Sequence, residues 1–95
     1  AVLTMNDSIT IGALKYCREN DLAIPDRLSL IAYGDVDNSE LFTVTPTCIS
    51  LTPHTIGQRA VKCLFDRIQD PDLRSREIIF DSTLVYGDSI ASLCE

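Results

Sequence analysis

The sequence has no tryptophan, a single methionine and a single histidine, and few basic residues, with 8 lysines and arginines against 14 aspartates and glutamates. The net charge of −6 argues against a chain that binds nucleic acid by itself, because phosphate contacts need clustered lysine and arginine. No apolar run approaches the ~20 residues that cross a bilayer, and no signal peptide is visible. Since the chain starts with Ala1 in an apolar run, we expect a piece of a longer protein.

Motifs of catalysis and of metal binding are also missing. His54 has no serine or cysteine at a spacing that suggests nucleophilic catalysis, so we interpret it as a surface residue near a helix start. The sequence contains no P-loop, no G-x-G-x-x-G and no G-x-S-x-G. We therefore expect a protein that is not an enzyme and that has no metal site and no cofactor.

The four cysteines include no C-x-x-C pair, which argues against a structural zinc site. Two disulfides are possible in a secreted domain of this size. However, Cys17 and Cys63 fall inside helical patterns and Cys48 inside a strand, where buried free thiols are common. The pattern, which also includes Cys94, favours a reduced, cytoplasmic protein.

Apolar spacing and turn residues predict alternating strands and helices. We expect strands at 1–5, 28–33 and 47–51, helices at 9–20 and 53–68, one helical turn at 39–42, and one or two strands within 77–86. The second helix has Thr52 as its N-cap and Pro53 at its first position. Residues from Gly87 onward are expected to form a tail. This order predicts one three-layer α/β domain with a mainly parallel sheet.

In such sheets, ligands bind beyond the carboxyl ends of the strands. Asn6 and Asp7 follow the first expected strand, and Gly34 and Asp35 follow the second. An amide and a carboxylate together can bind the hydroxyl groups of a small polar ligand. Asn6, Asp7 or the neighbouring serine can equally cap the first helix, and both interpretations stay open.

Six segments in register resemble motifs of the LacI/GalR family of transcription regulators, and together they cover nearly the whole chain. They are residues 3–14, 22–31, 33–35, 47–49, 56–68 and 84–89. The resemblance implies the periplasmic-binding-protein type I fold, in which two α/β lobes enclose a sugar or nucleobase. Residues 1–50 and 79–90 would then belong to the C-terminal lobe, and 51–78 to the N-terminal lobe. The DNA-binding headpiece of the family is absent, so any DNA contact would be made outside this chain.

The same resemblance assigns site residues. Asn6 matches the family asparagine that contacts the effector, and we expect the ligand site to include Asn6, Asp7 and Asp35. Gly34 stands where the family usually has the first aspartate of an Asp-Asp pair. This departure leaves open a different effector, a degenerate site or no site.

Ile11 and Phe42 match positions of the family's dimer contact, so we expect a homodimer. Gly87 replaces a usual arginine. The function implied is a small-molecule sensing and dimerisation module of a cytoplasmic transcription regulator, with a sugar-like effector and no membrane partner. The alternative is a secreted sugar-binding protein of an uptake system with the same fold.

Overall fold

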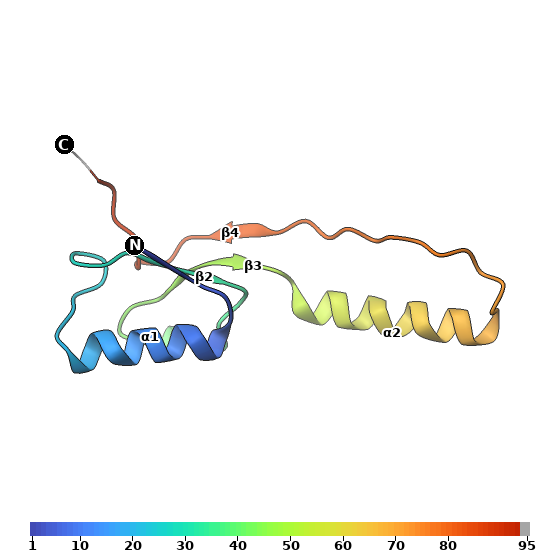
Figure 1. Cartoon of the computed structure of the whole chain (residues 1–95), viewed down its shortest axis with the longest axis horizontal. Helices are drawn as coiled ribbons and strands as arrows, with labels where there is room; N and C mark the ends of the chain where they lie inside the picture. The colour runs from blue at the N-terminus through green and yellow to red at the C-terminus, as the bar shows by residue number, and fades with distance from the viewer. Residues whose placement is uncertain (94–95) are drawn as a thin grey trace.

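The computed structural model describes residues 1–93, which form a small mixed sheet with one helix packed against it and a second helix extending away from it (Figure 1). The elements are β1 (Val2–Thr4), α1 (Asp7–Glu19), β2 (Leu30–Tyr33), the short 3₁₀ helix η1 (Ser39–Leu41), β3 (Thr47–Ser50), α2 (Pro53–Gln69) and β4 (Thr83–Val85). The predicted α/β alternation is confirmed.

The four strands form one sheet in the order β1-β2-β3-β4. β1, β2 and β3 are parallel, and β4 runs antiparallel to β3 with Ile49 opposite Leu84. α1 lies against β1 and β2 on one face of the sheet. The sheet is therefore mainly parallel, as predicted. The third layer of the expected architecture is not formed by residues 1–93, because α2 does not pack on this sheet.

The core lies between α1 and the first two strands. Leu30 and Ala32 of β2 are fully buried, and Cys17 of α1 is 5% exposed. Two buried threonines join the helix to the sheet through a hydrogen bond of 2.6 Å between the hydroxyl groups of Thr4 and Thr10. Thr10 also donates to the Asn6 carbonyl at 2.7 Å, which satisfies its polar atom inside the core.

α1 begins and ends through local hydrogen bonds. The side chain of Asn6 accepts from the amide of Ile9 at 2.8 Å, so Asn6 is the N-cap, and Asp7 in the first turn complements the helix dipole. The helix ends at Glu19 with Asn20 as its C-cap, after which Asp21 adopts a left-handed conformation with φ 53°. The predicted helix over 9–20 thus begins two residues earlier, because the cap lies at Asn6.

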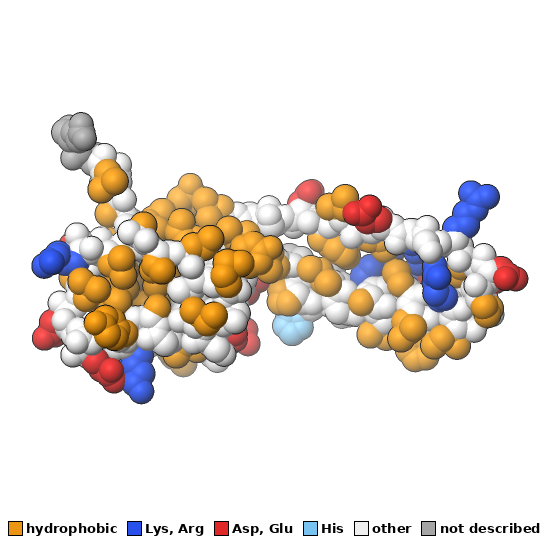
Figure 2. Space-filling model, viewed as in Figure 1, with side chains coloured by type: hydrophobic (Ala, Val, Ile, Leu, Met, Phe, Trp, Pro, Cys, Tyr) orange, Lys and Arg blue, Asp and Glu red, His pale blue; other side chains and the backbone are white. Residues whose placement is uncertain are grey.

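α2 and residues 70–82 form an arm that leaves the sheet and returns to it (Figure 1). α2 makes no close contact with α1 or with any strand in residues 1–93. Its apolar stripe is between 38% and 62% exposed and consists of Ile56, Val61, Leu64, Phe65 and Ile68 (Figure 2). The arm explains the elongated dimensions of 57 × 29 × 18 Å.

Thr52 occupies the N-cap position of α2, as predicted, but its side chain does not cap the helix. Its backbone is left-handed, with φ 47°, because the chain must turn sharply from β3 into the arm. Pro53 is the first helical residue. The expectation that the Thr52 hydroxyl stabilises the helix start is therefore wrong.

The prediction of a tail after Gly87 is also wrong, since residues 87–89 form a latch that bonds to the amino ends of β2 and β3. Asp88 accepts from the Thr45 amide at 2.5 Å and donates its own amide to the Thr45 carbonyl at 2.9 Å. The fully buried Ser89 hydroxyl accepts from the Thr47 amide at 2.7 Å and donates to the Leu30 carbonyl. The Leu30 amide in turn donates to the Ser89 carbonyl at 2.9 Å. These contacts are polar, so apolar spacing could not indicate them.

We predict that Ser89→Ala lowers the free energy of unfolding by about 2–3 kcal/mol, because it removes the buried acceptor of the Thr47 amide and the donor to Leu30. Urea denaturation followed by circular dichroism measures the change. Ser82→Ala, at an exposed serine, is the control and should change stability by less than about 0.5 kcal/mol. Equal effects of the two substitutions would contradict the structural role of the latch.

Candidate functional site

Asn6, Asp7 and Asp35 lie at the carboxyl edge of the sheet, where parallel β1 and β2 end. All three are exposed. One oxygen of each is already bonded to nearby backbone: Asn6 to the Ile9 amide at 2.8 Å, Asp7 to the Ser8 amide at 2.9 Å. Asp35 accepts from the Leu51 amide at 3.1 Å and so ties the loop after β2 to the end of β3.

Capping and ligand binding are compatible at this edge. Within residues 1–93, no hydrogen bond joins any two of these three side chains, and none engages the Nδ2 of Asn6. The edge therefore offers one amide donor and free carboxylate oxygens to solvent. Such a set can both donate to and accept from hydroxyl groups. Gly34 stands where the family that the chain resembles usually has an aspartate. It adopts φ 103° at the end of β2, a conformation that favours glycine.

The charge of Asp35 reaches Cys48 of β3. Burial raises the pKa of the Cys48 thiol, and the nearby Asp35 carboxylate raises it further, since both disfavour the thiolate. Cys17, Cys48 and Cys63 are free thiols, whereas Cys94 lies outside the described residues. No group of three or more histidine, cysteine or acidic side chains in residues 1–93 is arranged to hold a metal ion.

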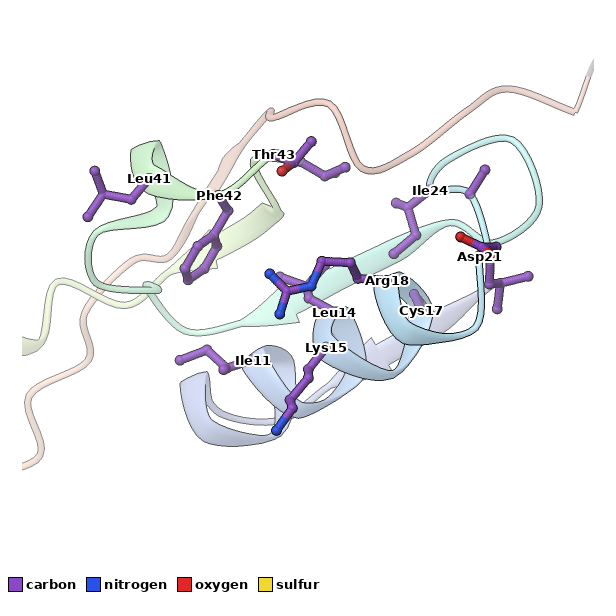
Figure 3. Close-up of a pocket in the computed structure, with 13 residues that line it drawn as sticks. Ile11, Leu14, Lys15, Cys17, Arg18, Asp21, Ile24, Leu41, Phe42 and Thr43 are labelled. Atoms are coloured by element: carbon purple, nitrogen blue, oxygen red, sulfur yellow. The ribbon is translucent and has the colours of Figure 1, made fainter.

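Ile11 and Phe42 lie in one apolar groove of about 600 Å³ on the outer side of α1. Phe42, in the segment after η1, points towards the helix, where Ile11 and Leu14 lie (Figure 3). Lys15 and Arg18 add positive charge to this groove. Ile11 is 46% exposed. The structure thus brings together two residues that are 31 positions apart in the sequence and that the family resemblance assigned to one interface.

Other residues of this groove were not singled out from the sequence. They are Leu14, Ile24, Leu41 and Val44, with Leu41 78% exposed. Helical spacing from Ile11 indicates Leu14 and Arg18, since they lie three and seven residues further along one face. Leu41 is the last residue of η1 and Val44 lies in the irregular segment after it. Neither belongs to a regular apolar spacing, so only the fold places them here.

Gly87 is explained by its neighbours rather than by a ligand. A Cβ atom at this position would overlap the carbonyl oxygen of Thr45, because the backbone of the latch passes close to residues 45–46, just before β3. The arginine that the resembling family usually has at this position would require residues 45–46 to shift.

Together, the mainly parallel sheet, its polar carboxyl edge and the arm that crosses away from it define a small α/β unit with an extended arm. The chain belongs to the family of periplasmic binding protein-like domains, whose family model matches residues 1–90. None of the helices within residues 1–93 is long and apolar enough to span a membrane.

Relatives by sequence include the HTH-type transcriptional repressor PurR of Mannheimia succiniciproducens, with 31% identity, and the ribose operon repressor of Haemophilus influenzae, with 30% identity. Each match covers 98% of this chain and 28% of the relative. A solved LacI family transcriptional regulator from Enterococcus faecium with bound ribose has a TM-score of 0.88 and 29% identity. That match covers 95% of this chain and 34% of the solved one.

The resemblance to LacI-type regulators is therefore confirmed by both sequence relatives and solved structures. The two sequence relatives named here are transcriptional repressors. The chain spans little more than a quarter of their length.

We predict that Asp35→Asn lowers the pKa of Cys48, because it removes a negative charge while keeping an acceptor for the Leu51 amide. Because the pKa of Cys48 is raised above its ordinary value of 9.0, its contribution to stability is fully present below that pH and is lost as the pH rises through the folded-state pKa. Alkylation of Cys48 at pH about 8.5 should therefore be faster in Asp35→Asn, measured by peptide mass spectrometry. Asp37→Asn, two residues away, is the matched control. An unchanged rate at Cys48 would disprove the coupling.

Proposed function

We propose that this chain is part of the effector-sensing domain of a LacI-type transcription regulator. The observation that carries the proposal is the likeness over 95% of the chain to a regulator with bound ribose. The polar carboxyl edge at Asn6, Asp7 and Asp35 supplies the hydrogen-bonding chemistry that a sugar-like effector needs. The chain acts by binding and not by catalysis, and it reaches DNA only through a headpiece in the complete protein.

The division into two lobes follows the arm. Residues 1–50 and 79–90 belong to the C-terminal lobe, and 51–78 to the N-terminal lobe. The left-handed turn at Thr52 and the return at β4 support this division, because the chain crosses away from the sheet and back at these two places. The exposed apolar stripe of α2 supports it further, since a surface of this kind is normally covered by a packing partner.

Effector binding between the lobes would favour one lobe arrangement and thereby change operator affinity. Coupling of this kind typically amounts to about 1–3 kcal/mol. The protein acts in the cytoplasm, where its DNA partner is found. The free thiols at Cys17, Cys48 and Cys63 favour this compartment over the secreted alternative.

In the complete protein, we expect calorimetric titration to detect binding of ribose or of a purine base, and Asn6→Asp to weaken it at least tenfold. Aspartate keeps the cap on the Ile9 amide but removes the Nδ2 donor, so the stability of α1 should be retained. Asn20→Asp, at the other end of α1, is the control and should leave the affinity unchanged.

Absence of binding to either ligand class would refute the sensing role. If a ligand binds Asn6→Asp as tightly as the unsubstituted protein, Asn6 is not part of the site, and the sensing role itself still stands. A ligand that binds without any effect on operator affinity would favour the uptake protein over the regulator.

We also propose that the groove at Ile11 and Phe42 is the contact between two copies of the chain. Its support is the convergence of Phe42, Ile11 and Leu14 on one exposed apolar surface. An isologous contact places the same groove of both copies face to face, so that each groove is covered by the other.

Light scattering of the chain under reducing conditions should therefore give a dimer that Ile11→Lys or Phe42→Lys converts to a monomer. A charge buried at an apolar contact costs several kcal/mol unless it is paired, and a lysine beside Lys15 and Arg18 adds repulsion, so a single substitution suffices. Tyr16→Lys is the control, because Tyr16 is 61% exposed on α1 and does not line the groove. A dimer that survives Phe42→Lys but not Phe65→Lys would place the contact on the arm instead.

A further inference from the structure

The arm concentrates the positive charge of an otherwise acidic chain. Five of the eight basic residues lie between Arg59 and Arg76, together with three acidic ones. Lysine and arginine side chains accordingly gather towards the far end of the arm (Figure 2). Nothing in the ligand edge or in the groove accounts for this concentration.

Three of these arginines line one hollow together with a cysteine. A hollow of about 300 Å³ opens between α2 and the returning segment, and its lining includes Cys63, Arg67, Arg74 and Arg76. The Nη2 atom of Arg76 donates to the Sγ atom of Cys63 at 3.4 Å. Cys63 is half-buried, so the hollow gives its sulfur an approach from solvent.

Asp66 offsets only part of this charge. Its Oδ2 atom lies 3.0 Å from Lys62 and 3.5 Å from Arg76. The Asp66 carboxylate therefore holds Arg76 in position beside Cys63, and it divides its negative charge between Arg76 and Lys62. Arg67 and Arg74 have no acidic partner within ion-pair distance in residues 1–93. The hollow thus combines a nucleophilic sulfur with uncompensated positive charge.

Most of the exposed apolar stripe lies on the side of α2 opposite Cys63. At about 100° per residue, Val61, Phe65 and Ile68 lie about 140–200° around the helix from Cys63, whereas Ile56 lies on the same side about two turns earlier. Cys63 and Asp66 are the half-buried residues of α2, on the side that faces the returning segment. A partner that covers Val61, Phe65 and Ile68 therefore leaves the hollow open.

We propose that this hollow is a thiol-modification site that takes an anionic low-molecular-weight disulfide. The arginines attract the anionic groups of the reagent and place its sulfur atoms beside Cys63. The thiol releases its proton to solvent, and its thiolate attacks one sulfur of the disulfide. A new S–S bond forms as the old one breaks, and the other half of the reagent leaves as a thiolate. The product is a mixed disulfide at Cys63.

The test compares an anionic disulfide, dithiobis(nitrobenzoate), with an uncharged dipyridyl disulfide on the reduced chain. Peptide mass spectrometry assigns the modified cysteine at each time. We expect the peptide that contains Cys63 to react before those that contain Cys17 and Cys48, and Cys63→Ser to leave no fast reaction at either of these two cysteines. Arg74→Gln and Arg76→Gln should each lower the anionic-to-uncharged rate ratio at Cys63 about threefold, the typical effect of one exposed charge. Arg59→Gln, on the same helix but outside the hollow, should not.

An equal fall of the ratio in all three arginine variants would overturn the proposal, since it would indicate only the general charge of the arm. A Cys63 that reacts no faster than Cys48 would also overturn it. Continued protection of the buried Cys17 shows that each variant is folded. A competition experiment on the unsubstituted chain needs no variant. Inorganic phosphate should slow the reaction of the anionic reagent with Cys63 but not that of the uncharged reagent. Equal slowing of both reactions, or no slowing of either, would refute the site.

Discussion

The hydroxyl group of Ser89 is the contact on which the arrangement of this chain depends most. It bridges the Thr47 amide and the Leu30 carbonyl, and so joins two parallel strands through a residue that lies 42 positions beyond Thr47. Around it, Asp88 and Gly87 pair with residues 45–47. These bonds return the chain to the sheet after the whole length of the arm. Without them, β4 would have only three residues of pairing with β3 to hold it.

The strands and helices of the sheet could be predicted from the sequence because their apolar spacing is regular. β2 and β3 are continuous apolar and β-branched runs, and α1 follows a polar cap, so each local pattern agrees with the final structure. The strand predicted within 77–86 is longer than β4 as the structure has it, Thr83–Val85, for a physical reason. The apolar residues of 77–82 resemble a strand, but pairing requires a neighbouring edge, and in this chain β3 offers one only opposite Thr83–Val85.

The candidate sites differ in how many of their residues and contacts could be predicted from the sequence. Asn6 and Asp35 follow apolar strands, so their place at the carboxyl edge is fixed by topology. Their backbone bonds to Ile9 and Leu51 are visible only in three dimensions. Cys63 and Arg76 meet because the chain reverses after α2, and the length of an irregular return is not encoded in any periodicity. Long-range polar contacts of this kind were the part that sequence patterns missed.

The arm also has a mechanical consequence. A helix of 17 residues, the length of α2, is about 25 Å long at 1.5 Å per residue. Within residues 1–93, it is connected to the sheet through the left-handed turn at Thr52 on one side and through the returning segment with the short pairing of β4 on the other. A lever of this length converts a rotation of about 10° at its pivot into a displacement of about 4 Å at its tip. Small changes in the backbone at the edge of the sheet, where Asp35 is bonded to Leu51, are therefore amplified at the far end of the arm.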